Sequence, residues 1–149
     1  MIYEFCAENV TLLEKAMQAG ARRIELCDNL AVGGTTPSYG VTKAAVELAA
    51  NYDTTIMTMI RPRGGDFVYN DLEIAIMLED IRLTAQAGSQ GVVFGALTAD
   101  KKLDKPNLEK LIAASKGMEI VFHMAFDELS DEDQLEAIDW LSQVGVTRI

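Results

Sequence analysis

Residues 19–27, Ala-Gly-Ala-Arg-Arg-Ile-Glu-Leu-Cys, have the pattern of a helix end followed directly by a strand. Gly20 is typical of the residue that ends a helix, and the alternating side chains from Ile24 to Cys27 are typical of a strand. The same order returns at residues 87–92 and again at residues 144–149, each time with a glycine before the strand. A repeat of this kind predicts parallel strands joined by helical crossovers.

The alternation of strand and helix runs along the whole chain. Apolar periodicity predicts strands at residues 2–6, 23–27, 55–60, 91–95 and 119–123, and helices at residues 9–19, 41–50, 71–87, 105–116 and 131–143. No Gly-x-Gly-x-x-Gly sequence follows the first strand, which favours a (β/α)8 TIM barrel over a dinucleotide-binding fold. A full barrel takes about 200 to 250 residues, and the chain has 149. We therefore expect an α/β fold in a single domain, residues 1–149: a TIM-type barrel, incomplete at its C-terminus, with about five βα units and the start of a sixth strand.

Helical spacing also predicts which side chains face the core. In the first helix the apolar face comprises Val10, Leu13, Ala16 and Met17. In the third it comprises Leu72, Ile76 and Ile81.

Composition restricts the classes of partner. The chain has 13 Lys+Arg against 23 Asp+Glu, a net charge of -10, which argues against a nucleic-acid partner because phosphate contacts need clustered cations. No apolar run approaches the roughly 18 residues of a membrane span, and no signal-peptide pattern opens the chain. Two cysteines without a secretory signal are typical of reduced thiols, so we expect a cytoplasmic protein with no membrane partner.

Strand parity selects the side chains that face the interior of the barrel. Glu4 and Cys6 share one face of the first strand, and Glu25 and Cys27 repeat the arrangement on the second. The other inward positions are Met57, Met59, Arg61, Val93, Gly95, Val121 and His123. Because barrel chemistry lies at the carboxyl ends of the strands, we expect one group of candidates there. It comprises Cys6, Cys27, Arg61 and His123, with Glu4, Glu25 and Met59 one layer deeper.

The sulfur atoms of this group indicate a soft metal. Neighbouring strands lie about 4.8 Å apart, so Cys6 and Cys27 could share one ion, with Met59 or His123 completing the shell. Thiolate, thioether and imidazole ligands suit Cu(I) or zinc. The alternative is that both cysteines are packing residues, since cysteine is among the most buried residue types.

The charged candidates indicate a second hypothesis. Two carboxylates deep in a barrel need a cationic partner, for which Arg61 or Arg63 is available. The loop Arg61-Pro-Arg63-Gly-Gly-Asp66-Phe could bind a phosphate or carboxylate, or it could be an ion-paired loop with Asp66 and Asp71. On the first reading the protein is an enzyme for a small polar or anionic metabolite, with Glu25, Arg61 and His123 as catalytic residues.

Three stretches of the sequence resemble the CutC family of proteins named for copper homeostasis. They are residues 23–38, with Arg-Ile-Glu-Leu-Cys, Gly-Gly and Thr-Pro-Ser; residues 60–67; and residues 122–127, Phe-His-Met-Ala-Phe-Asp. The resemblance implies a TIM barrel, a cytosolic homodimer and copper bound by Cys6 and Cys27. It also places Asp127 with Glu4, Arg63 and Asp66 among the candidate ligand-binding residues.

Two departures from the family pattern bear on function. Met124 stands where the family usually has an arginine, which removes one positive charge near the pocket and weakens anion binding there. Family members also continue past residue 149. A third alternative is therefore a fragment without activity of its own, whose open sheet edge favours pairing with a second copy.

Overall fold

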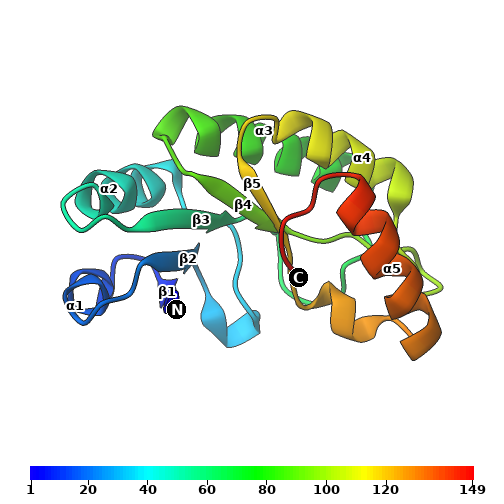
Figure 1. Cartoon of the computed structure of the whole chain (residues 1–149). Coiled ribbons are helices and arrows are strands. Elements are labelled where there is room, and N and C mark those ends of the chain that lie inside the picture. Colours follow the sequence, from blue (N-terminus) through cyan, green and yellow to red (C-terminus); the bar gives the residue numbers. More distant parts are fainter.

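The computed structural model describes residues 1–149 as a five-stranded parallel sheet with helices on its outer side (Figure 1). The strands are β1 (Glu4–Glu8), β2 (Arg23–Cys27), β3 (Thr55–Met59), β4 (Gly91–Phe94) and β5 (Glu119–Phe122). The helices are α1 (Leu13–Gln18), α2 (Tyr39–Ala49), α3 (Asp71–Ala87), α4 (Lys105–Ala114) and α5 (Asp131–Gln143). Short 3-10 helices lie at Leu30–Val32 and Met124–Glu128. None of the helices is long and apolar enough to cross a lipid bilayer.

The strand order is β1-β2-β3-β4-β5, and every neighbouring pair is parallel. A sixth strand begins beside β5. The Thr147 amide donates to the Ile120 carbonyl at 2.8 Å, and the Phe122 amide donates to the Arg148 carbonyl at 3.0 Å. The predicted succession of five strand–helix units and the start of a sixth strand is confirmed.

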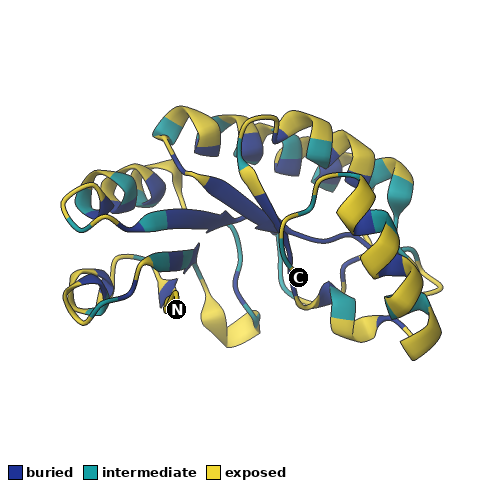
Figure 2. Cartoon of the chain, viewed as in Figure 1, coloured by how far each residue is buried: buried dark blue, intermediate teal, exposed yellow.

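Two faces of the sheet carry different side chains. The outer face packs against the helices in two apolar clusters, one under α1 and α2 and one under α3, α4 and α5. The inner face carries a small separate cluster of buried residues: Cys27, Met57, Met59, Val93 and Val121. Figure 2 shows the buried strands at the centre and exposed residues along the outer side of the helices. The predicted strand parity is confirmed, because every member of the inner cluster is a residue expected to face inward.

The helix faces differ in part from the prediction. In α3 the buried residues are Ile74, Met77, Ile81 and Thr84. Leu72 and Ile76 are exposed, so their assignment to the core was wrong. They lie about 200° around the helix from Ile74, because each residue turns the helix by about 100°. Val10 is exposed because α1 begins only at Leu13, after a turn in which Leu12 has a φ of +57°.

Candidate metal centre and its cavity

The register of β1 and β2 sets the positions of the two cysteines. Cys6 lies opposite Glu25, and Cys27 lies opposite Glu8. The expectation that both cysteines occupy one layer, with Glu25 below them, was therefore wrong. Strands in a barrel are staggered, so equivalent positions in two similar tripeptides need not be cross-strand neighbours. The cysteines lie on a diagonal with Glu25 between them.

The three side chains nevertheless converge. Cys6 Sγ donates to Glu25 Oε1 at 3.5 Å, and Cys27 Sγ approaches the same oxygen at 3.8 Å. The two sulfur atoms and the carboxylate oxygen all lie within 4.8 Å of one another. Cys6 is exposed and Cys27 is buried, so this group, which could hold a metal ion, is reached from the side of Cys6.

Hydrogen bonding and burial shift the pKa values of this group in different directions. The hydrogen bond from Cys27 lowers the pKa of the Cys6 thiol, despite the opposing effects of burial and of Glu25. The same hydrogen bond and burial raise the pKa of Cys27. Burial raises the pKa of the Glu25 carboxyl. Cys6 is consequently the thiol that ionises first.

A glycine loop covers Cys27, and Arg61 holds this loop in place. Gly34 has a φ of +87°, and a Cβ there would lie 3.0 Å from Cys27 Sγ, so only glycine fits without displacement. Arg61 Nη1 donates to the carbonyls of Val32 at 2.8 Å and Gly34 at 3.0 Å, and its Nη2 donates to Gly65 at 2.7 Å. Arg61 is only 2% exposed. Its guanidinium therefore ties two loops together over the carboxyl ends of the strands.

The other arginine of this loop is held in an ion-paired cluster. Arg63 pairs with Asp66 at 3.0 Å and, through a short contact, with Glu73, and it stacks on Tyr69 with its Cζ 5.3 Å from the ring centroid. The expected partner Asp66 is present, whereas Glu73 takes the place foreseen for Asp71. Glu73 is drawn there because it also closes the capping box of α3 with Asn70.

His123 is buried at the carboxyl end of β5. Its Nδ1 accepts a hydrogen bond from the Ala125 amide at 3.2 Å, and its Nε2 has no partner in the chain. Burial, with the positive charge of Arg61, lowers the pKa of His123 to about 3. The imidazole is thus neutral, and it does not belong to the Cys6–Glu25–Cys27 group.

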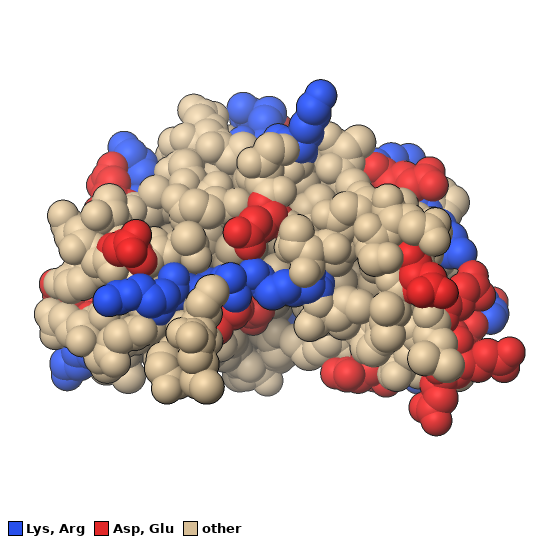
Figure 3. All heavy atoms as spheres, in the orientation of Figure 1, with Lys and Arg blue, Asp and Glu red and all other residues tan.

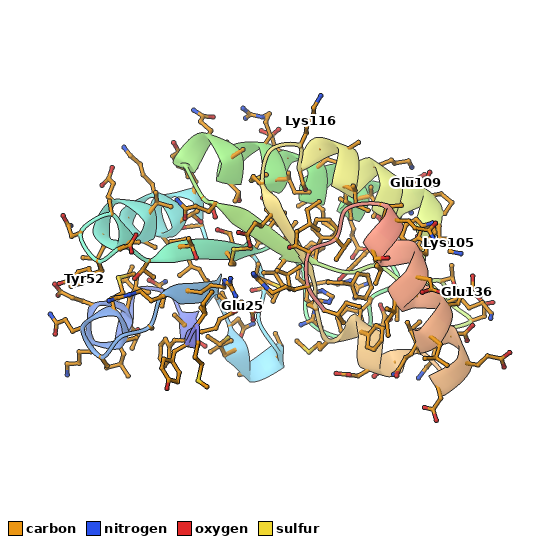
Figure 4. All side chains as sticks on the ribbon, viewed as in Figure 1. Glu25, Tyr52, Lys105, Glu109, Lys116 and Glu136 are labelled. Carbon is orange, nitrogen blue, oxygen red and sulfur yellow. The ribbon has the colours of Figure 1, made fainter.

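A cavity of about 410 Å³ opens on the inner face of the sheet. It brings together five of the predicted candidate residues, Glu4, Glu25, Met59, His123 and Asp127. Its lining contains neither cysteine, and Arg61, Arg63 and Asp66 also lie outside it. The complete lining is Glu4, Glu25, Met59, Val121, Phe122, His123, Met124, Phe126, Asp127, Arg148 and Ile149. Figure 4 shows Glu25 on β2, at the inner side of the arc of strands.

The inward carboxylates have cationic partners that the sequence interpretation missed. Arg23 pairs with Glu4 at 3.3 Å, and Arg148 pairs with Glu119 at 3.0 Å. Burial still raises the pKa of Glu25, and the charge of Arg148 opposes this only in part. The expectation that Arg61 or Arg63 would serve was wrong, because both lie in loops and are engaged there. Parity could have found Arg23, since it lies two residues before Glu25 on the same face. In Figure 3 a band of basic side chains crosses the centre of the visible face, and acidic side chains gather at the lower right, near α5.

Comparison with known proteins decides the family. The model of the CutC family matches residues 1–149. The chain belongs to the CutC family. The family protein CutC of Enterococcus faecalis is 55% identical over 149 residues, covering 100% of this chain and 71% of that protein. The family protein CutC of Bacteroides thetaiotaomicron is 42% identical, covering 99% of this chain and 57% of that protein.

Solved structures agree on family and fold. A crystal structure of CutC from Streptococcus agalactiae, described as a proposed copper homeostasis protein, superposes with a TM-score of 0.96 at 50% identity. It is covered over 71% of its length by the whole of this CutC chain. A proposed phosphonomutase of Burkholderia cenocepacia has a TM-score of 0.72 at 18% identity, covering 100% of this chain and 61% of that one, and shares the fold alone. The prediction of a TIM-barrel-type α/β fold is confirmed.

Proposed function

We propose that this CutC chain binds Cu(I) through Cys6 and Cys27 in a reducing cytoplasm, as part of copper homeostasis. The observation that carries the proposal is the convergence of two thiols and one carboxylate within 4.8 Å. A metal–thiolate bond is about 2.3 Å for zinc, so two sulfurs that share an ion lie at most about 4.6 Å apart. Small side-chain rotations suffice to reach that separation.

The donor set favours Cu(I) over harder ions. Two thiolates are soft ligands, which select Cu(I) and zinc over magnesium, calcium or manganese. Structural zinc sites are closed by four ligands, and the group offers three. Met59 supports the Cu(I) assignment, since it belongs to the same small buried cluster as Cys27 and places a thioether near the buried thiol.

An anaerobic competition titration tests the proposal. The wild-type chain should withdraw one Cu(I) from a chromophoric chelator, with an affinity that rises with pH because protons compete for both thiols. The Cys6→Ser/Cys27→Ser chain should not compete. The exposed Met124→Leu variant serves as a sulfur-lacking control and should retain the wild-type affinity. Equal Cu(I) affinity in the wild-type and double-serine chains would overturn the proposal.

A second candidate function, enzymatic action on a small polar metabolite, is favoured by the cavity that holds Glu25 and His123. Burial raises the pKa of the Glu25 carboxyl, and a raised carboxyl pKa favours a role in proton transfer. Neutral His123 would donate a hydrogen bond, and Arg61 would position the loops around the site. Incubation of the chain with a pool of metabolites should deplete one compound, and Glu25→Gln should abolish that depletion. A pool unchanged by the wild-type chain would count against enzymatic function.

A further inference from the structure

Two hydrogen-bond donors without partners belong to residues that line one cavity. His123 Nε2 and Arg148 Nη2 are both buried and both lack a hydrogen-bond partner in the chain. Both residues line the 410 Å³ cavity on the inner face of the sheet. Buried donors without partners cost free energy, so native proteins pair nearly all of them. Two such donors beside one cavity indicate that an acceptor group from a ligand completes them.

The hydrogen bonding of His123 fixes where its proton lies. Nδ1 accepts the Ala125 amide hydrogen, so this nitrogen carries no proton and the neutral ring carries its proton on Nε2. His123 therefore offers an Nε2–H donor, and the guanidinium of Arg148 offers a charged N–H donor. A ligand carboxylate matches this pair, because it accepts two hydrogen bonds and carries the charge opposite to arginine.

The same cavity carries the opposite charge on other lining residues. Glu4, Glu25 and Asp127 present three carboxylates against the single arginine of the lining. Arg23 already pairs with Glu4, whereas no cation pairs with Asp127. A ligand that was only an anion would lie near the carboxyl groups of Glu25 and Asp127, neither of which has a cationic partner. A ligand that also carried an ammonium group would satisfy both halves of the lining.

We propose that this cavity binds a small zwitterion of the amino-acid class. Its carboxylate receives His123 Nε2–H and Arg148 Nη2–H, and its ammonium faces Asp127 and Glu25. The volume of about 410 Å³ falls within the range of small-molecule sites. Both nitrogen atoms are covered in the structure, so the ligand must displace side chains of the lining to reach them. Met59 and Met124, both in the lining, have flexible side chains that can move. The proposal deepens the second candidate function by naming its ligand class. It shares Glu25 with the candidate metal group but requires neither thiol.

Matched sets of three compounds test the charge requirement. Leucine, 4-methylpentanoate and 3-methylbutylamine share a side chain, and phenylalanine, 3-phenylpropanoate and phenethylamine form a second set. Saturation-transfer NMR and thermal shift on the wild-type chain should detect the amino acid of at least one set. The corresponding acid and amine should bind about tenfold or more weakly, since each loses one charged contact. Absence of binding by every amino acid up to millimolar concentration, or equal binding of the acid alone, would overturn the proposal.

Variants assign the contacts within the cavity. His123→Asn keeps an acceptor for the Ala125 amide but removes the Nε2–H donor, and it should weaken amino-acid binding about tenfold. His123→Gln restores a donor and should recover part of the loss. Asp127→Asn should weaken binding of the amino acid but not of the acid, whereas Glu47→Gln, an exposed change on α2 away from the cavity, should leave both unchanged. Unchanged affinity in both His123→Asn and Asp127→Asn would refute the assignment.

The Cys6→Ser/Cys27→Ser chain should still bind the amino acid, so failure of Cu(I) binding is distinguishable from failure of this site. Binding without any turnover would count against enzymatic function alone.

Discussion

The thiols of Cys6 and Cys27 differ in both exposure and proton affinity. Cys6 is exposed with a lowered pKa, and Cys27 is buried with a raised pKa. We therefore expect iodoacetamide to alkylate Cys6 quickly in the folded chain and Cys27 only after unfolding, because the thiolate is the reactive form. Peptide mass spectrometry of timed samples measures both rates.

Glu25 lowers the reactivity of the Cys6 thiol. Its charge and its hydrogen bond both raise the pKa of Cys6. Glu25→Gln should consequently accelerate alkylation of Cys6 at pH 7, whereas Glu47→Gln, an exposed change on α2, should leave the rate unchanged. A slower rate in Glu25→Gln would show that Glu25 activates the thiol instead.

His123 should make stability depend on pH. Its pKa is near 6.5 in an unfolded chain and about 3 in the folded one, so between these values only the unfolded chain binds the proton. The free energy of unfolding therefore keeps this contribution above pH 6.5 and loses it as the pH falls, by about 2 kcal/mol between pH 7 and pH 5. Urea unfolding at both pH values measures the loss. His123→Asn should show a correspondingly smaller loss, and an equal loss in both chains would contradict the assignment.

The alternation of side chains along the strands predicted more of the candidate site than the chemical types of the residues did. Alternation along β2 correctly turned Glu25 and Cys27 inward, because neighbouring residues of a strand must face opposite ways. The same argument could not predict which groups pair with the charged side chains. Arg61 is conspicuous in sequence as a cation, yet its guanidinium is occupied by loop carbonyls, which carry no sequence signature.

At the scale of elements, the loop after β2 and the loop after β3 depend on one side chain. Replacing Arg61 with methionine leaves the carbonyls of Val32, Gly34 and Gly65 without their donor. We expect a loss of about 3 kcal/mol in the free energy of unfolding, since buried polar groups without partners are costly. Urea unfolding measures it, and Arg82→Met on the exposed face of α3 should change stability by less than about 0.5 kcal/mol. A similar loss in both variants would show that Arg61 has no special role in the loops.

The element boundaries followed from local signals, whereas the register did not. Residues 71–87 and 131–143 were predicted with the bounds that α3 and α5 have, because Asn70, Gly88 and Ser130 mark their ends. The pairing of Cys6 with Glu25 depends on how far β1 slides along β2. That offset is set by the curvature of the whole sheet, which no single segment encodes.

For the molecule as a whole, β1 leaves one edge of the sheet without a partner strand. Beside that edge, Ile2, Tyr3 and Leu12 are exposed apolar residues. We propose that two copies of the chain associate there, because unpaired edges with apolar neighbours favour self-association. Sedimentation velocity should show a concentration-dependent dimer that Tyr3→Lys weakens and Leu135→Lys, an exposed change on α5, does not. A chain that stays monomeric at every concentration would contradict this proposal.

The staggered register of β1 and β2 also bears on oxidation. Residues one strand apart and two positions along lie roughly 8 Å apart at Cα, and this is the offset between Cys6 and Cys27. Cysteines more than about 7 Å apart at Cα cannot form a disulfide without backbone movement. The pair can approach a common ion yet resists direct coupling, so diamide with glutathione should yield a mixed disulfide on Cys6 instead of an internal bridge. Glutathione bound to Cys6 would block the metal site until a thiol reductant removed it. No internal disulfide would cross-link β1 and β2 at any stage.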